Sequence, residues 1–290
     1  MSEPELTSSS ALPSHQREEF EAAVDLLGRG KFTVLTGAGL STDSGIPDYR
    51  GPSAPPRKPM TFQQFMSSDS FRRHYWARNH VGYRFMRDVE PNEGHRAIAR
   101  MDARGYVTGT ITQNVDLLHE KAGSNVVIDL HGRSDRVVCL TCHQRISRAH
   151  MQVLLDVHNP GFDVDVGDVE VAPDADAVLE ATDDFIVPPC PVCGGILKPD
   201  VVYFGENVPK ERVARAFKIV DGGACLLVAG TSLAVFSGRR FVRHAGHNNI
   251  PVVIINQGKT NSDADATVRI HAGTTETLVA LERALVGTRR

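Results

Sequence analysis

The sequence has 290 residues, of which 32 are basic and 35 acidic, so its net charge is −3 with neutral histidines. This balance gives no electrostatic reason to expect nucleic acid or an anionic membrane as a specific partner. No apolar run approaches the roughly 18 to 20 residues that span a bilayer, and the N-terminus resembles neither a signal peptide nor a mitochondrial presequence. We therefore expect a cytoplasmic protein whose polar residues 1–15 form a disordered tail.

Helical and strand-like patterns alternate along most of the chain. A helical pattern over 16–28 precedes a β-branched, apolar run over 31–36 that predicts a buried strand. The same alternation predicts strands at 106–112, 126–130, 201–204, 224–229 and 250–255, and helices at 91–105, 117–123, 210–220, 239–246 and 276–285. Strands that alternate with helices are typical of a doubly wound, Rossmann-like α/β fold with a parallel sheet, here built from 16–132 and 201–290.

Two segments depart from this alternation. Residues 52–90 have prolines at 52, 55, 56 and 59, followed by many aromatic residues. This pattern predicts a mobile flap followed by helices. Residues 133–200 contain two C-x-x-C pairs separated by a segment rich in Asp, Val and Pro. We expect the second segment to be a small inserted module with a long acidic loop.

A glycine-containing loop follows the first predicted strand. Gly37 and Gly39 would let backbone N–H groups approach a ligand, and the polar residues after them could begin a helix whose N-terminus attracts a pyrophosphate. The ordinary dinucleotide fingerprint has a third glycine where this chain has Thr42. On these residues alone, a tight turn without a ligand remains an equal alternative.

Polar residues also follow three later strands. Residues 113–116, 230–232 and 256–258 occupy such positions, and the carboxyl ends of parallel strands meet at one crevice. Helix caps and turns are the alternative. His131 ends another strand, and the pKa of a histidine suits a general base near neutral pH. With 12 histidines in the chain, a structural role would be the more common outcome for His131 taken alone.

The four paired cysteines predict a metal site. Thiolates from Cys139, Cys142, Cys190 and Cys193 would fill the tetrahedral coordination of one structural zinc ion and leave no position for water. A redox pair is the competing interpretation. The fifth cysteine, Cys225, lies within a predicted apolar strand, which favours a buried and unreactive thiol.

The loop from Gly37 to Arg50, with the pattern Gly-Ala-Gly-x-Ser-x-x-Ser-Gly-Ile-Pro-Asp-Tyr-Arg, resembles the signature of the sirtuins, which are NAD-dependent protein-lysine deacylases. Leu130-His131-Gly132, seven residues before the first cysteine, resembles the site of the sirtuin catalytic histidine. The resemblance covers about residues 20–285. Tyr49, the sequence Phe236-Ser237-Gly238 and the long segment between the cysteine pairs are similar to class II sirtuins, the mitochondrial-type members and their bacterial relatives.

The resemblance implies that NAD is the cofactor, that one structural zinc ion is bound per chain, and that acylated lysine side chains of other proteins are the substrate. It also implies that His131 acts as the base on the ribose hydroxyls, Asn114 positions ribose and water, Asp116 holds the nicotinamide amide, and Tyr49 shields the reacting carbon. The residues that would bind the cofactor are Gly37, Ala38, Gly39, Ser41, Ile46, Pro47, Asp48, Tyr49, Arg50, Arg57, Gln113, Asn114, Val115, Asp116, Gly230, Thr231, Ser232, Asn256, Gln257, Gly258 and Thr274.

Two further stretches resemble the edges between which sirtuins hold an extended acyl-lysine peptide as an added strand. These stretches are 202–206 and 232–237, and the binding residues implied are Val202, Phe204, Gly205, Glu206 and Val235. Tyr75 and Arg78 would share a helical face and could pair with an acidic acyl chain. The alternatives are mono-ADP-ribosyl transfer or lipoamide removal on the same scaffold, a plain NAD hydrolase, and a weakly catalytic NAD-sensing binding module.

Overall fold

The computed structural model describes residues 16–50, 59–162 and 182–287, together with Ala172, Pro173, Ala177 and Leu179. The expected tail, Arg57 with the first part of the expected flap, and most of the expected acidic loop lie outside the described residues. No helix within the described ranges is both long enough and apolar enough to cross a bilayer.

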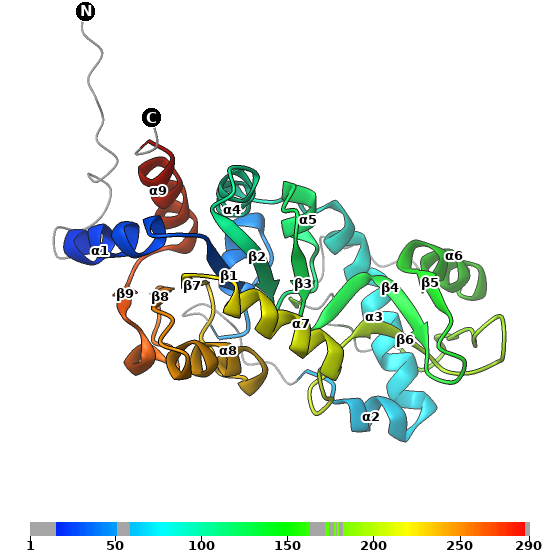
Figure 1. Ribbon diagram of the computed structural model, residues 1–290. Helices are drawn as coiled ribbons and strands as arrows, with labels where there is room; N and C mark the ends of the chain where they lie inside the picture. The colour runs from blue at the N-terminus through cyan, green and yellow to red at the C-terminus, as the bar shows by residue number, and fades with distance from the viewer. Residues whose placement is uncertain are drawn as a thin grey trace, which may run out of the picture.

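A six-stranded sheet forms the centre of the larger unit (Figure 1). All its neighbouring strands pair in parallel, in the order β3-β2-β1-β7-β8-β9. This is the order of a doubly wound fold, with the reversal of strand order between β1 and β7. The strands are β1 Phe32–Thr36, β2 Val107–Thr112, β3 Val127–Asp129, β7 Cys225–Ala229, β8 Val252–Ile255 and β9 Val268–Ile270. The predicted fold class is confirmed.

Helices cover both faces of this sheet and enclose two separate apolar cores. On one face, α1 (Arg17–Gly28), α4 (Glu93–Ala103) and α9 (Thr274–Gly287) pack over β1, β7 and β8. On the other face, α7 (Lys210–Asp221) and α8 (Phe236–His247) pack over the same strands. Burial on both faces explains why the strands read as continuous apolar runs rather than as alternating patterns.

Helix α4 shows how local sequence sets the bounds of an element. The Asn92 side chain accepts hydrogen bonds from the backbone N–H groups of Gly94 and His95, which would otherwise lack partners in the first turn. After the helix, Gly105 adopts φ +78°, a conformation that glycine tolerates best. The chain then turns directly into β2.

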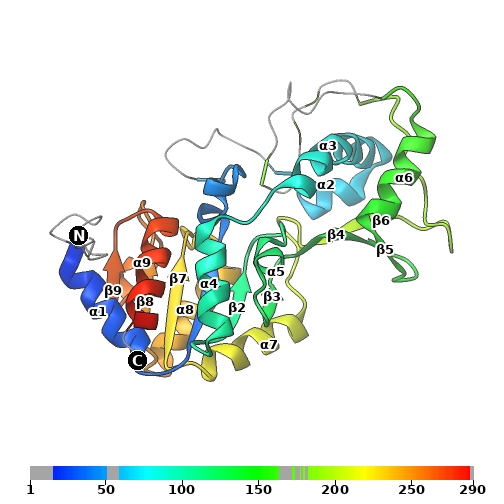
Figure 2. The same ribbon diagram turned by 90° about the horizontal axis from the view of Figure 1, so that it is seen from above.

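The smaller unit combines a three-stranded antiparallel sheet with three helices, and both views place it beyond β3 (Figures 1 and 2). Its strand order is β5-β4-β6, and Phe65, Trp76, Met151 and Leu197 share one core with two of the paired cysteines. Its elements are β4 Gly132–Cys139, β5 Arg145–Ser147, β6 Leu197–Val201, α2 Phe62–Ser67, α3 Asp69–Asp88 and α6 Arg148–His158. The helices after the expected flap therefore pack with the inserted segment.

Several elements differ from the sequence prediction. The strand expected at 201–204 is wrong, because the chain pairs with β4 earlier, over Leu197–Val201, and turns away after it. The glycine loop continues into two short 3-10 helices, Ala38–Leu40 and Thr42–Ser44, rather than an α-helix. Strand β9, helix α6 and the 20-residue length of α3 were not predicted. The short helix α5, Leu118–Ala122, ends at Gly123, as predicted.

Candidate functional site

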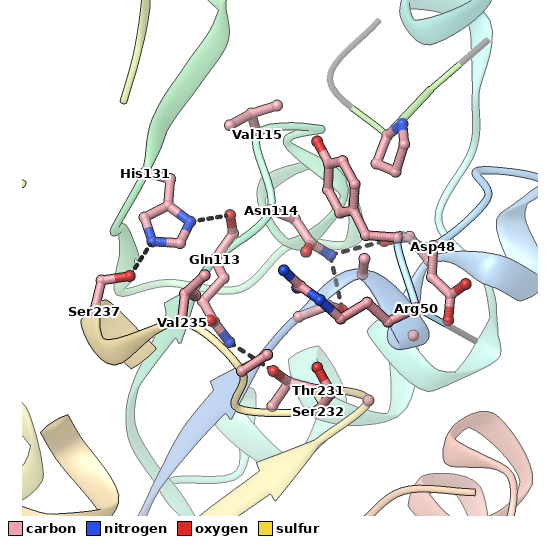
Figure 3. A pocket seen from close by; sticks show the side chains of 18 of the residues that line it. Asp48, Arg50, Gln113, Asn114, Val115, His131, Thr231, Ser232, Val235 and Ser237 are labelled. Carbon is pink, nitrogen blue, oxygen red and sulfur yellow. Dashed lines mark hydrogen bonds between the residues drawn. The ribbon is translucent and has the colours of Figure 1, made fainter. Parts of the chain in front are cut away.

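A cavity of about 790 Å³ opens at the carboxyl ends of β1, β2 and β7, where the strand order reverses (Figure 3). It is lined by both units, since Tyr75 of α3 and Val201 of β6 reach the same space as the glycine loop. Every predicted cofactor residue that the structure describes lines it: Gly37, Ala38, Gly39, Ser41, Ile46, Pro47, Asp48, Tyr49, Arg50, Gln113, Asn114, Val115, Asp116, Gly230, Thr231, Ser232, Asn256, Gln257, Gly258 and Thr274. A cavity of this size accommodates a ligand of dinucleotide class.

The glycines of the loop are required by packing between two turns. Gly39 donates its N–H to the carbonyl of Gly230 at 2.8 Å, and a Cβ on Gly37 would lie 2.7 Å from Cβ of Thr231. Gly230 has φ +65°, and its own Cβ would lie 2.4 Å from the backbone nitrogen of Leu40. The close approach of the β1 and β7 turns thus explains these glycines, and it fixes the loop at the mouth of the cavity.

Asp116 is the centre of a buried polar network below this loop. One of its carboxylate oxygens accepts the hydroxyl of Ser41 at 2.7 Å, and the other accepts the N–H of Leu118 at 3.0 Å. Asn114 donates its side-chain amide to the Ser41 hydroxyl oxygen and to the carbonyl of Gly37, at 3.0 and 3.1 Å. Burial raises the pKa of Asp116, while the hydrogen bonds act in the opposite direction. The network links the ends of β1 and β2 through one carboxylate.

His131 also lines the cavity, and both of its ring nitrogens are hydrogen-bonded (Figure 3). Its Nδ1 is 2.9 Å from the carbonyl oxygen of Gln113, and a carbonyl only accepts, so Nδ1 carries the proton. In the neutral ring Nε2 is then the acceptor, and the hydroxyl of Ser237 donates to it at 2.7 Å. Burial, followed by the charges of Arg212 and Arg240, lowers the pKa of His131 to about 4, against the bond to Gln113, which raises it. The imidazole is therefore neutral at pH 7, with the tautomer that a base acting through Nε2 requires.

The residues of both predicted peptide edges line the cavity. They are Val202, Phe204, Gly205 and Glu206 of the first edge and Val235 of the second. The first edge is held in place, because the Glu206 carboxylate accepts the N–H of Tyr203 at 2.9 Å and the ammonium group of Lys198 at 3.1 Å. Lys198 is 3% exposed, and burial lowers its pKa despite the nearby Glu206 charge.

The structure separates Tyr75 from Arg78. The Tyr75 ring lines the cavity and packs edge-on against Phe65 and at a tilt against Tyr203. Arg78 is not among the residues that line the cavity; it donates to the carbonyl of Ala177 at 2.5 Å and bonds to His74 at 3.0 Å. The two residues share a helix but do not meet at one site.

The four predicted metal ligands come together in the smaller unit. All four Sγ atoms lie within 4.8 Å of one another, with Cys139 to Cys193 at 3.5 Å and Cys142 to Cys190 at 3.8 Å. A tetrahedral zinc ion with Zn–S bonds of about 2.3 Å sets its sulfur atoms about 3.8 Å apart. Backbone N–H groups of Thr141 and Cys142 also donate to the Cys139 sulfur, which stabilises a thiolate. The donor set fits a closed structural zinc site.

The cavity has further lining residues that were not named as ligand contacts. Ser237 and Tyr203 belong to the two predicted peptide edges, but only the fold shows that the Ser237 hydroxyl meets His131. The others are Thr42, Asp43, Met60, Pro173, Val201, Asn207, Val208, Ala234, Phe236, Arg240, Lys259, Gly273 and Glu276.

Comparison with known proteins gives a consistent result. The Sir2 family pattern matches residues 37–237. The chain is 54% identical over 268 residues to NAD-dependent protein deacetylase 1 of Mycobacterium avium (strain 104), covering 91% of this chain and 95% of that protein. It is 46% identical over 277 residues to NAD-dependent protein deacetylase of Xanthomonas axonopodis pv. citri (strain 306), covering 93% and 92%.

Solved structures agree with the sequence relatives. A structure from work on the mechanism and regulation of Sir2 enzymes superposes with a TM-score of 0.72 at 28% identity, covering 94% of this chain and 99% of its own. A Sir2 protein with a p53 peptide and NAD+ superposes with a TM-score of 0.68 at 28% identity, covering 89% and 95%. The chain belongs to the Sir2 family, as the resemblance to the sirtuins predicted.

Proposed function

We propose that this protein is an NAD-dependent protein-lysine deacylase that releases nicotinamide and O-acyl-ADP-ribose. Its relatives in Mycobacterium avium and Xanthomonas are named NAD-dependent protein deacetylases, and related Sir2 structures hold a p53 peptide with NAD+ or a propionylated peptide. The observation that carries the proposal is one cavity that joins a neutral His131 to the Asp116 network and to two peptide edges.

The residues of the larger unit fit NAD. The glycine loop and the turns after β7 and β8 would hold the dinucleotide, because they line the cavity at the ends of parallel strands. Asn114 and Asp116 lie together at one side, where an amide and a carboxylate can bind a ribose and a carboxamide. Bound NAD would supply the ribose carbon that the acyl oxygen attacks, the ribose hydroxyl that takes the acyl group, and the nicotinamide that leaves.

His131 would act as the general base. Its Nδ1 proton stays with the Gln113 carbonyl, so Nε2 is the atom that gains a proton from a ribose hydroxyl. The carbonyl of Gln113 also stabilises the imidazolium that forms, since the Nδ1–H bond strengthens when the ring becomes charged. Burial of the ring, which lowers the pKa of His131 to about 4, keeps this base neutral before the reaction.

The Val202–Glu206 segment and Val235 would bind the substrate backbone as an added strand. Such main-chain pairing is independent of the substrate sequence, so one site can accept acylated lysines from many proteins. Tyr75, Tyr203 and Phe204 line the same space and would surround the apolar stem of the lysine. The zinc ion would have a structural role only, in stabilising the smaller unit, which forms one wall of the cavity.

A cytoplasmic location remains a proposal, to be tested by cell fractionation.

The direct test uses the purified protein with NAD and lysine peptides that carry acetyl, propionyl, succinyl, glutaryl or lipoyl groups. Mass spectrometry should show a free lysine, with nicotinamide and O-acyl-ADP-ribose in equal amounts, and unacylated peptide is the matched control. A peptide that gains an ADP-ribose group would instead indicate ADP-ribosyl transfer. Loss of NAD without any change in the peptides would indicate an NAD hydrolase, and NAD binding without turnover would indicate a sensor.

A further inference from the structure

Ser237 occupies the nitrogen through which His131 would act. The Ser237 Oγ lies 2.7 Å from Nε2 of His131, and Nδ1 is already bonded to the Gln113 carbonyl (Figure 3). The only lone pair of the neutral imidazole ring therefore accepts the Ser237 hydroxyl. A proton that travels from a ligand in this cavity to His131 must either displace Ser237 or pass through it.

The fold places Ser237 with little freedom. It is the second residue of α8, and the next residue, Gly238, packs so closely that a Cβ there would lie 2.4 Å from the side-chain oxygen of Gln113. Gln113 is itself fixed by bonds from its side-chain amide to Thr36 and Thr231. The first turn of α8 thus packs against Gln113, whose carbonyl orients Nδ1 of His131. Gln113 and Ser237 therefore hold the two ring nitrogens of His131 and are themselves packed together.

The chemistry of a hydroxyl suits a relay position. Ser237 lines the cavity, and its oxygen has two acceptor sites besides its own proton. It can therefore accept a proton from a ligand hydroxyl while it gives its own to Nε2. The exposed N–H groups at the start of a helix also favour partial negative charge on an oxygen in the first turn. The charged groups that act on the ring are Arg212 of α7 and Arg240 of α8.

We propose that Ser237 is a catalytic residue that relays a proton from a ribose hydroxyl of the bound cofactor to Nε2 of His131. The O–H bond of the ribose hydroxyl breaks as a new O–H bond forms on Ser237, and the original Ser237 O–H bond breaks as N–H forms at Nε2. The ribose oxygen would keep the electron pair of its broken O–H bond, and the imidazole would become an imidazolium. This inference rests on the proposed function and assigns a second residue to its proton transfer.

The test compares Ser237→Ala with Ser237→Thr, which keeps a hydroxyl at the same position. We expect Ser237→Ala to lower kcat by about 100-fold, at the lower end of the range for a lost proton-transfer group, with the Kd for NAD unchanged. Ser237→Thr should retain most of the activity. In mixtures of H2O and D2O, the rate of the unaltered enzyme and of Ser237→Thr should depend on the D2O fraction along a curve, as expected for two protons in motion, and the Ser237→Ala rate should depend on it linearly.

A second readout needs no turnover. In the ligand-free protein, 15N NMR of the histidine rings should show a neutral His131 protonated on Nδ1, with an Nε2 resonance that moves in Ser237→Ala and stays near its place in Ser237→Thr. The pKa of His131 should rise in Ser237→Ala, because the hydroxyl donates to the neutral form of the ring.

Unchanged kcat in Ser237→Ala, or a curved isotope dependence that persists in it, would overturn the relay. An increase in kcat would mean that Ser237 blocks the base and must be displaced, which also contradicts the proposal. If the unaltered enzyme shows no deacylation, the proposed function fails, and the NMR comparison still reports separately on the Ser237–His131 bond.

Discussion

The two units of this protein hold their reactive groups in different ways. In the larger unit, Asp116 and His131 are hydrogen-bonded to Ser41 and Gln113, in segments that follow strands β1 and β2 of the sheet. In the smaller unit, one core is joined to a cluster of four thiols. Among the described residues, that cluster is the only group of three or more metal-ligating side chains close enough to share an ion.

The two sites should therefore be sensitive to different changes in conditions. A site held by buried hydrogen bonds responds to protons, because burial shifts pKa values and protonation breaks the bonds. A site held by thiolates responds to metal removal and oxidation, because binding free energy of the ion is also folding free energy of the unit. Since the cavity has walls from both units, we expect each kind of damage to reach the reaction by a different route.

The largest effect should follow from removing the base of the larger unit. His131→Ala should lower kcat for deacylation by about 10²- to 10⁴-fold, the usual contribution of a general base. NAD affinity should change little, because the dinucleotide residues lie on the other strand ends. Steady-state kinetics and calorimetric titration with NAD measure the two quantities, and normal turnover in the variant would remove His131 from the mechanism. His244→Ala, which removes a partly exposed ring that contacts the Asp221 carboxylate outside the cavity, is the control for loss of a histidine.

The next effect begins in the smaller unit, with loss of its metal ion. Cys190→Ala should abolish zinc binding, because three ligands leave the site open and expose the core next to it. Elemental analysis should give one zinc per unaltered chain and none in the variant. Native thiol labelling after chelation should reach four cysteines quickly, while burial, which raises the pKa of Cys225 to about 12, protects the fifth. Full activity of a metal-free protein would contradict a structural role for the ion.

A smaller effect should follow from separating the two turns of the larger unit. Gly230→Ala adds a Cβ 2.4 Å from the nitrogen of Leu40 and forces a side chain onto φ +65°. We expect a loss of about 1–3 kcal/mol of unfolding free energy, from strain of this kind, together with weaker NAD binding. Gly45→Ala is the matched control, because φ is +87° there but nothing lies within 4 Å of the new Cβ. Equal losses in both variants would show that the backbone conformation matters and the close approach does not.

Much of this organisation could be predicted from the sequence. Apart from β9, the parallel sheet follows from apolar runs such as those over β1, β7 and β8, and the zinc site follows from cysteine spacing, since both are local patterns. The residues that line the cavity could be grouped because strand ends converge at one edge. Strand β9 was missed because its three residues are too few to show a period.

The remaining features depend on contacts between distant segments. The pairing of Ser237 with His131 joins residues 106 positions apart, and no spacing rule encodes it. Likewise, Tyr75 and Arg78 are correctly placed on one helix, yet Arg78 is bonded to Ala177 and does not line the cavity. The chain turns after Val201 because β6 pairs with β4, and this pairing could not be read from the apolar run that continues past it.

The last effect that we expect is a pH dependence of stability in the larger unit. Burial lowers the pKa of His119 to about 4, and its Nε2 is bonded to Thr36 at 2.9 Å in a neutral form. Below the unfolded pKa of about 6.5, the unfolded chain binds a proton that the folded chain does not, so folding is favoured above pH 6.5 and weakens as pH falls toward 4. Each such histidine should contribute a slope of about 1.4 kcal/mol per pH unit in this window. His119→Gln keeps a polar group near Thr36 without this titration, so urea unfolding between pH 4.5 and 6.5 should show a shallower slope than in the unaltered chain. An unchanged slope would mean that His119 takes up its proton within the folded larger unit.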